Sequence, residues 1–380
     1  MTDPTIHEGK QGLDPYDAVL LVSFGGPEAP DDVIPFLENV TRGRGIPKQR
    51  LAEVGDHYLL YGGRSPINDQ CRSLLTALRQ ELDQRAITTP LYWGNRNWKP
   101  YLRDALSDVA ADGHRRVLAM FTSAYPSYSS CRQYRENLYD AANGLPIQID
   151  RIRHYATHPG FVTASVAATV AALDELQSGT GDIRLLFVTH SIPIAMALTA
   201  GPEPRSAQGA YVDWHVAVAA EISRQVSQQR DRAYQFDLAY CSRSGPPEQP
   251  WLEPDVKARL GELKAIGATG VVLVPIGFVS DHMEVIFDLD IEAARTAADL
   301  GLRFSRAATA GTHPAFIAAL ADLLIERGQV ARGEETMPAV IPGGQLGWYA
   351  CPRECCPNRT EPDRPTLCAA FSTGARASRS

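Results

Sequence analysis

The stretch Leu185-Leu186-Phe187-Val188-Thr189-His190 is an apolar run that ends in two polar side chains. The run is continuous rather than alternating, which is typical of a strand buried on both faces of a parallel sheet. With seven similar runs, the predicted strands are 17–24, 90–94, 116–121, 147–152, 184–189, 236–241, 269–275 and 302–307. Segments with helical spacing lie between them, for example at 72–84, 162–176, 211–229 and 254–265. Strands that alternate with helices predict an α/β protein with doubly wound, parallel four-stranded sheets.

The composition is that of a folded globular protein. The 380 residues are 44% hydrophobic and 21% charged, with a formal net charge of −7. These values exclude a small disulfide scaffold and offer no basic surface for DNA or RNA, so we expect no nucleic-acid partner. The chain starts without the pattern of a signal peptide, and no apolar run is long enough for a transmembrane segment. We therefore expect a cytoplasmic protein whose seven cysteines form no disulfide framework. Because the sequence shows no coiled-coil pattern, we expect a monomer.

A repeated pentapeptide divides the chain into two halves. Thr157-His158-Pro159-Gly160-Phe161 returns as Thr312-His313-Pro314-Ala315-Phe316, each time after a predicted strand. Each copy predicts a helix start with a threonine cap and a proline in the first turn, and its histidine is interpreted as a helix-start residue and not as a ligand. The predicted parts are a polar N-terminal arm (1–15), two Rossmann-like halves (16–155 and 156–331) and a Cys-bearing, partly disordered tail (332–380). Ligands of such folds bind beyond the carboxyl ends of the strands, here in the cleft between the halves.

Three carboxylates follow one of the predicted strands. Glu284, Asp288 and Glu292 recur at intervals of four in a segment with helical character. Like charges at that spacing destabilise a helix by roughly 0.2–0.5 kcal/mol per pair, so the row needs either full solvation or a cation. The segment directly follows the strand 269–275 and the loop 276–282, where active sites of these folds lie, and this position favours a cation path over a solvated acidic face.

His190 stands where the cleft is expected, at the end of a strand. Histidine exchanges protons near neutral pH and coordinates metals such as Fe²⁺, although a hydrogen-bonded turn residue is the alternative. The neighbouring Ser191 lacks the G-x-S-x-G pattern of serine hydrolases. The first strand is followed by Phe24-Gly25-Gly26-Pro27-Glu28, which has neither G-x-G-x-x-G nor a Walker lysine, so nucleotide binding is not expected.

Four motifs together resemble the ferrochelatase family. They are Leu20-Leu21-Val22-Ser23-Phe24-Gly25-Gly26-Pro27, Gly62-Gly63-Arg64-Ser65-Pro66, Val188-Thr189-His190-Ser191-Ile192-Pro193 and Pro275-Ile276-Gly277-Phe278-Val279-Ser280-Asp281-His282-Met283-Glu284. They stand in the family's order and spacing, and the resemblance extends from about residue 17 to 330. Gly94-Asn95-Arg96-Asn97-Trp98 and the cysteine-bearing tail are similar to the actinobacterial branch, whose members act on coproporphyrin III.

The resemblance implies roles for the polar residues. His190 matches the family's catalytic histidine, and Glu284 matches a glutamate that faces it across the porphyrin. Together they are expected to act as proton acceptor and metal donor. Asp288 and Glu292 match an acidic row that extends from Glu284 toward solvent, often on a π-helical turn, so the implied metal contacts are His190, Glu284, Asp288 and Glu292.

Four further residues are implied to contact the porphyrin. Ser65 and Tyr134 match positions that bind its propionates, and Arg44 is expected as a third contact, with a solvated surface charge as the alternative. Phe24 stands where some relatives have a tyrosine that approaches the metal. A phenolate ligand is excluded there, and we expect the Phe24 ring to pack against the macrocycle.

The tail motif Cys351-Pro352-Arg353-Glu354-Cys355-Cys356-Pro357 resembles the cysteine cluster of ferrochelatases that hold a [2Fe–2S] centre, which takes four thiolates. Relatives draw the fourth cysteine from the region that joins the halves. Residues 151–170 contain no cysteine, and Ala164 stands near the expected place. We assign Cys368 as the fourth ligand, with Cys131 and Cys241 as substitutes. A zinc site and a metal-free tail are the alternatives, and Cys71 is expected in the core.

The resemblance implies an enzyme of haem biosynthesis. Its expected reaction inserts Fe²⁺ into coproporphyrin III to give coproheme, with transient contacts to other haem-pathway enzymes. There are two enzymatic alternatives. One is insertion of iron into protoporphyrin IX, and the other is insertion of another metal into a less oxidised tetrapyrrole. A non-catalytic haem-binding protein with His190 as axial ligand is the alternative from another class, but it leaves the acidic row unexplained.

Overall fold

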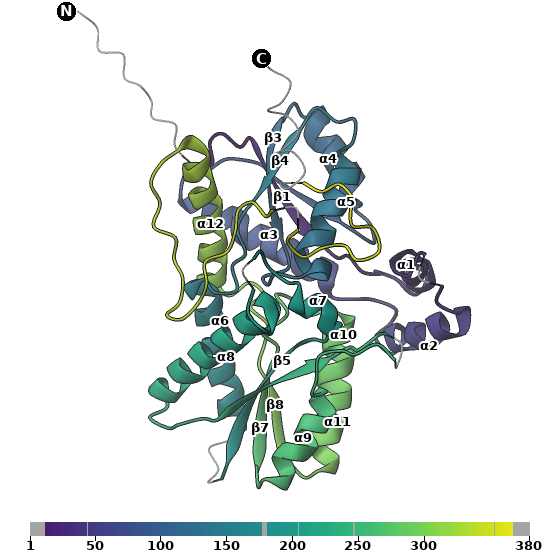
Figure 1. The fold of residues 1–380 in the computed structure, drawn as a ribbon, viewed down its shortest axis with the longest axis vertical. Helices are drawn as coiled ribbons and strands as arrows, with labels where there is room; N and C mark the ends of the chain where they lie inside the picture. Colours follow the sequence, from purple (N-terminus) through teal and green to yellow (C-terminus); the bar gives the residue numbers. More distant parts are fainter. Residues whose placement is uncertain are drawn as a thin grey trace, which may run out of the picture.

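The computed structural model describes residues 12–367, except 44, 177–180, 204, 246–247 and 353. Two parallel four-stranded sheets confirm the predicted fold class. The first, in the order β2-β1-β3-β4, contains β1 (Ala18–Ser23), β2 (Leu91–Asn95), β3 (Arg116–Phe121) and β4 (Gln148–Arg151). The second, in the order β6-β5-β7-β8, contains β5 (Ile183–His190), β6 (Phe236–Cys241), β7 (Gly270–Val274) and β8 (Arg303–Arg306). Figure 1 shows the two sheets one above the other along the long axis.

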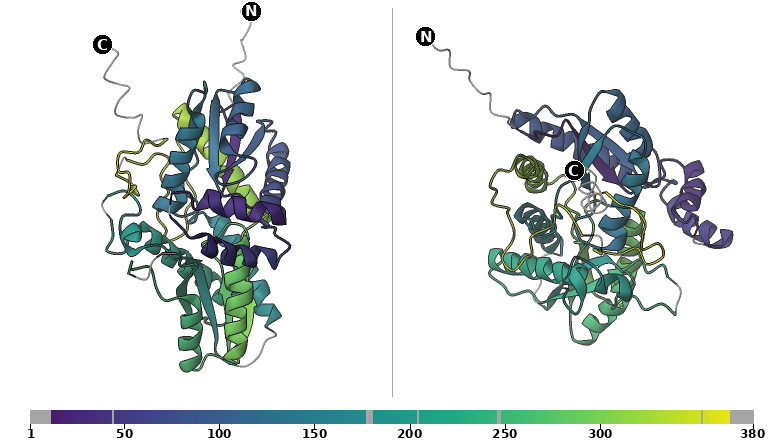
Figure 2. Two further views of the ribbon diagram at one scale, coloured as in Figure 1. Left: turned by 90° about the vertical axis from the view of Figure 1, so that its right-hand side faces the viewer. Right: turned by 45° about the horizontal axis from the view of Figure 1, so that its top comes forward.

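Helices cover both sheets. Those of the first half are the 3-10 helix η1 (Pro30–Asp32), α1 (Val33–Val40), α2 (Lys48–Leu59), α3 (Ile67–Gln84), α4 (Leu102–Ala111), the π-helix η2 (Tyr128–Arg132) and α5 (Gln133–Ala142). Those of the second half are α6 (Pro159–Glu175), α7 (Ile194–Leu198), α8 (Gly209–Gln229), α9 (Val256–Ala265), α10 (Met283–Val285), the π-helix η3 (Ile286–Ala293), α11 (Ala294–Asp299) and α12 (Pro314–Arg332). No helix in the described part of the chain combines the length and the hydropathy that a membrane span requires. In Figures 1 and 2, α1 and α2 project to one side of the first half.

The strand orders locate the ligand edge of each sheet. In both sheets the strand that comes first in its half pairs with strands on either side, so the chain reverses its winding direction between β1 and β3 and between β5 and β7. Ligands of doubly wound folds bind at such switch points, beyond the carboxyl ends of the strands.

Most element boundaries agree with the sequence to within a few residues, and α3 is the main difference. It begins at Ile67 rather than at the predicted residue 72. The polar run Asn68-Asp69-Gln70 hides the apolar spacing of its first turn, although Ile67 and Asn68 are both buried.

Both copies of the repeated pentapeptide begin helices, but the predicted threonine cap was wrong. The helices start at the prolines, so the histidines occupy the N-cap positions. The Nδ1 atoms of His158 and His313 each accept a hydrogen bond from a backbone N–H of the first turn, at 3.1 and 3.2 Å. The Thr157 hydroxyl instead donates to the carbonyl of Gln345 in the tail at 2.7 Å. The histidines are therefore helix-start residues, as expected.

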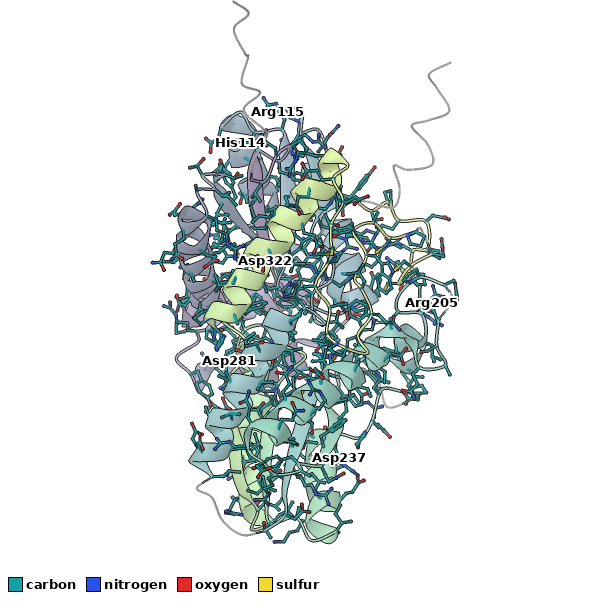
Figure 3. The ribbon with its side chains drawn as sticks, turned by 90° about the vertical axis from the view of Figure 1, so that its left-hand side faces the viewer. His114, Arg115, Arg205, Asp237, Asp281 and Asp322 are labelled. Carbon is teal, nitrogen blue, oxygen red and sulfur yellow. The ribbon has the colours of Figure 1, made fainter. Side chains whose placement is uncertain are left out.

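Helix α12 joins the two halves. It packs against α6 of its own half and α3 of the first half. Asp322, labelled on α12 in Figure 3, forms an ion pair with Arg85 at 2.5 Å. One hydrophobic cluster contains buried residues of both sheets, so the halves share a core.

The tail lies against both halves. Residues 334–367 contain neither helix nor strand in their described part, in agreement with their lack of periodicity. The backbone N–H of Ile341 donates to the Thr157 carbonyl at 2.9 Å, and the guanidinium of Arg205, labelled in Figure 3, donates to the Glu354 carbonyl at 3.1 Å. The disorder predicted for the end of the tail lies outside the described residues, as does most of the N-terminal arm.

The crossing of α6 and α12 requires glycine at position 160. A Cβ atom there would lie 2.4 Å from the Ala315 carbonyl oxygen and 2.7 Å from the Ala319 Cβ. We predict that Gly160→Ala lowers the free energy of unfolding by about 1–3 kcal/mol, because overpacking pushes the helices apart. The control Gly261→Ala has open space around it in α9 and should raise stability by about 0.5–1 kcal/mol. Urea unfolding measures both, and a Gly160→Ala variant as stable as the parent would contradict this packing.

Candidate active site

A cavity of about 640 Å³ lies at the switch points of both sheets. Its walls include residues at the carboxyl ends of three strands from each half, namely Phe24, Arg96, Thr122, His190, Ser244 and Gly277. Because parallel strands end at the same edge of their sheet, side chains far apart in the sequence meet here. The predicted cleft between the halves is therefore present, and it has the size of a site for a small organic ligand.

His190 is the last residue of β5 and lines the cavity. Its Nδ1 contacts the carbonyl oxygen of Ser191, which can only accept a hydrogen bond. In the neutral ring Nδ1 therefore carries the proton and Nε2 keeps its lone pair. The side chain is 32% exposed, so a ligand in the cavity can reach this lone pair.

The carboxylate of Glu284 lies next to this ring. The distance from His190 Nε2 to Glu284 Oε2 is 3.6 Å. A flat macrocycle between the two groups would need about 7 Å, because it makes a contact of ~3.5 Å on each face. The expected placement across the porphyrin is therefore wrong in this structure. The strands β5 and β7 are neighbours, and the segments that follow them bring both groups to the same wall.

The acidic row continues from Glu284 along the π-helix η3. The π-helical geometry agrees with the expectation and keeps residues four apart near one face. Asp288 is largely buried, and its carboxylate accepts a hydrogen bond from the Ser242 hydroxyl. Burial raises the pKa of Asp288 to about 6, and the negative charges of Glu284 and Glu292 act in the same direction. This carboxyl can therefore gain and lose a proton near neutral pH.

The outer end of the row is paired with a cation from another helix. The Nζ of Lys257 in α9 lies 2.9 Å from Glu292 Oε2, and both side chains are partly exposed. Because Glu292 has this ion-pair partner, it is not a carboxylate that is surrounded only by solvent. Across the described part of the chain, no group of three or more His, Cys, Asp or Glu side chains is arranged to hold a metal ion as it stands.

The cavity also brings together three of the four residues expected to contact a porphyrin. Phe24, Ser65 and Tyr134 all line it, whereas Arg44 lies outside the described residues. The guanidinium of Arg96 stands 4.6 Å from the ring centre of Tyr134 and 5.7 Å from that of Phe24. Sequence reasoning missed Arg96 as a site residue, although its position directly after β2 was the signal that could have found it.

A second missed feature is a wall rich in hydroxyl groups. It follows β3 and consists of Thr122, Ser123, Ser127, Tyr128, Ser129 and Ser130. The Ser127 hydroxyl caps η2 by accepting from the backbone N–H of Ser130 at 3.1 Å. The hydroxyls of Ser127, Ser130 and Tyr128 already donate to protein oxygens. The other hydroxyls of the wall are the uncharged donors that suit carboxylate groups of a ligand.

Four cysteines gather on the other side of η2. The thiol of Cys355 donates to Cys356, and Cys131 and Cys351 are the electrostatic neighbours of these two thiols. The sulfurs of Cys355 and Cys356 are 3.7 Å apart, and all four thiols are buried and free. Cys368, the expected fourth member, lies outside the described residues.

Hydrogen-bond donors surround these thiols. Arg151 Nη2 donates to Cys351 Sγ at 3.0 Å, and the backbone N–H of Gly201 donates to Cys356 Sγ at 3.2 Å. Such donors stabilise thiolates. The ring of His154 is buried near Cys131, but neither of its nitrogens has a hydrogen-bond partner in the described structure.

The other two cysteines lie elsewhere. Cys241 is beside the acidic row, where burial raises its thiol pKa and the Asp288 and Glu284 carboxylates add to the shift. Cys71 is in the core, as expected.

The raised pKa of Asp288 predicts a gain in stability when the charge is removed. A buried carboxyl with a pKa above its unfolded value of ~4 weakens the fold as the pH rises from about 4 to 6, and the full penalty persists above 6. We predict that Asp288→Asn raises the free energy of unfolding by on the order of 1–3 kcal/mol at pH 7.5, a gain that disappears near pH 4. Chemical denaturation at both pH values measures this. A variant less stable than the parent at pH 7.5 would show that the charged form is favoured.

Comparison with known proteins identifies the family of the chain. The family model described as Ferrochelatase matches residues 16–328. A protein of Streptomyces coelicolor named Coproporphyrin III ferrochelatase is 52% identical over 94% of this chain and 97% of its own length. One of the same name from Streptomyces griseus is 51% identical, over 91% of this chain and 94% of its own length. A protein of Rhodopirellula baltica named Ferrochelatase is 45% identical over 90% and 94% of the two chains. With a family match over most of its length and relatives of this similarity, the chain belongs to the ferrochelatase family.

Proposed function

We propose that this protein inserts Fe²⁺ into coproporphyrin III and releases coproheme. The observation that carries the proposal is the pair formed by the His190 lone pair and the Glu284 carboxylate on one wall of the cavity between the halves. The names of its relatives from two Streptomyces species support coproporphyrin III as the substrate.

The chemistry of insertion needs a proton acceptor and a metal donor at one place. Fe²⁺ replaces two pyrrole N–H protons, so the balanced products are the iron porphyrin and two H⁺. His190 Nε2 can accept a proton, and the carboxylate 3.6 Å away stabilises the resulting imidazolium. The Glu284 oxygens and the His190 nitrogen are also ligands that Fe²⁺ accepts.

The acidic row supplies a route for the cation and the released protons. Asp288 can exchange protons near neutral pH and stands between Glu284 and Glu292 along η3. A divalent cation that arrives at Glu292 meets the Lys257 ammonium first. We propose that the cation displaces this ammonium and then passes to Asp288 and Glu284.

The cavity walls suit a porphyrin with several carboxylates. Arg96 provides a cation, and the hydroxyl wall after β3 provides uncharged donors on the side of η2. Ser65 and Tyr134 add further polar groups, and Phe24 adds an aromatic face. Coproporphyrin III carries four propionates, so it benefits more from this number of donors than protoporphyrin IX does.

We propose that the four clustered cysteines hold a [2Fe–2S] centre, with Cys131 in place of Cys368. The support for this proposal is that the thiols of Cys131, Cys351, Cys355 and Cys356 are buried neighbours and that N–H groups donate to Cys351 and Cys356, although the four thiols would have to rearrange to hold a metal. When bound, the centre would supply one-electron redox chemistry. The cytoplasmic location, the monomeric state and the contacts with other haem-pathway enzymes stay predictions.

We predict that His190→Ala lowers the rate of iron insertion at least 100-fold, because proton acceptors typically contribute 10²–10⁴-fold. The assay follows the absorption spectrum of purified protein with Fe²⁺ and either coproporphyrin III or protoporphyrin IX, without oxygen. Coproporphyrin should be converted faster.

The matched control is His114→Ala, on the surface of the first half (Figure 3), which should leave the rate unchanged. Substantial turnover by His190→Ala would reduce His190 to a structural residue. Absence of conversion by the parent protein, with a Soret band of bound haem from the start, would instead indicate a haem carrier.

We predict that Cys131→Ser removes the [2Fe–2S] centre. The parent, purified without oxygen, should contain about two iron and two sulfide per chain and a visible absorption that dithionite bleaches. Cys71→Ala, a change at a buried thiol that is not among the four clustered cysteines, should keep both properties. Zinc in place of iron and sulfide would indicate a zinc site, no metal at all would indicate a metal-free tail, and unchanged iron and sulfide in Cys131→Ser would point to another fourth ligand.

A further inference from the structure

The peptide between His190 and Ser191 is anchored by a phenol from another helix. Tyr211 lies in the first turn of α8 and is 5% exposed. Its hydroxyl lies 2.8 Å from the carbonyl oxygen of His190 and 2.8 Å from the hydroxyl of Thr189. The phenol therefore holds the Thr189 side chain and the carbonyl of the peptide between His190 and Ser191.

The direction of these hydrogen bonds follows from the number of protons. A phenol has one O–H, and a carbonyl oxygen can only accept, so Tyr211 donates to His190. The Thr189 hydroxyl must then donate to the phenol oxygen. Burial raises the pKa of Tyr211 far above neutral pH, so the phenol stays a donor throughout the working range.

The anchored peptide controls the ring of His190. The Nδ1 of that ring donates to the carbonyl of Ser191, the residue whose nitrogen belongs to the anchored peptide. Ser191 is itself held by its backbone N–H on the Cys241 carbonyl at 2.8 Å and by its hydroxyl on the Leu252 carbonyl at 2.9 Å. Without the bond from Tyr211, the carbonyl of the 190–191 peptide loses its hydrogen bond to the phenol and is restrained only by the pairing of β5 with β6, so the direction of Nε2 is less well defined.

The phenol is in turn held by aromatic packing. The ring centre of Tyr211 lies 4.5 Å from that of His215, which stacks on Tyr125 at 3.5 Å. The Nδ1 of His215 contacts the Tyr211 carbonyl at 2.6 Å, and burial lowers the pKa of His215 to about 3. The stack is therefore uncharged and fixes the ring of Tyr211 without repelling a cation in the cavity.

We propose that Tyr211 is a positioning residue for the reaction, because its phenol fixes the His190 carbonyl and thereby the direction of the His190 Nε2 lone pair toward Glu284. This inference rests on the proposed role of His190. Interactions that orient a ligand or base through a second residue typically contribute 10–100-fold.

The test is Tyr211→Phe, which removes the hydroxyl and keeps the ring on His215. We expect kcat for iron insertion to fall about 10-fold, while KM for Fe²⁺ and for coproporphyrin III changes less than about 2-fold. The electron paramagnetic resonance spectrum of added ferric coproporphyrin III should show one axial-ligand species in the parent and a mixture in the variant. A merely structural loss would not produce this mixture.

The matched control is Tyr240→Phe. Tyr240 is equally buried at 5% exposure and lies on β6 directly opposite Thr189, but its contacts do not include the His190 carbonyl. It should keep the kcat and the spectrum of the parent.

Thr189→Val removes the second hydrogen-bond partner of the phenol and should lower kcat about 3-fold. This variant provides the test if Tyr211→Phe does not fold.

A kcat for Tyr211→Phe within 2-fold of the parent, with an unchanged spectrum, would overturn the inference, and so would an unchanged kcat for Thr189→Val. The proposed function fails in a different way, by retained turnover of His190→Ala. An inactive His190→Ala with a fully active Tyr211→Phe would remove only the role of Tyr211.

Discussion

The parallel pairing of β5 with β6 and β7 is the constraint on which the active site depends. Because parallel strands end at one edge, it brings His190, Ser242 and the loop before Glu284 together from segments far apart in the chain. The first sheet repeats this arrangement with β1 at its centre. Two such edges facing one cavity leave room for a flat ligand that touches both halves, which neither half could enclose alone.

The site carries a local cost that the rest of the fold offsets. Asp288 is buried close to two other carboxylates, and η3 is a π-helix, a rare element that is frequent at functional sites. The shared core and the bridge made by α12 hold the halves in place around these features. Such a division between a rigid scaffold and a destabilised site is typical of enzymes.

The short π-helix η2 lies between the clustered thiols and the cavity. Cys131 lies on η2, whose other residues contribute to the hydroxyl wall, and the tail thiols pack against it from outside. The thiols therefore lie next to the π-helical turn that lines the ligand site. Ordering of the tail without helix or strand depends on hydrogen bonds to the backbone and side chains of both halves, such as that from Arg205.

The sequence by itself determined the α/β class, the eight strands, the helix starts at the repeated pentapeptide and several of the residues that line the cavity, among them Phe24, His190 and Glu284. These follow from local spacing and motif, because apolar runs and turn residues act over a few positions. Tertiary structure alone decided that His190 and Glu284 share one wall and that Cys131 lies with the tail thiols. These contacts depend on strand order and on how far a side chain extends across the cleft, and no local pattern in the chain encodes either.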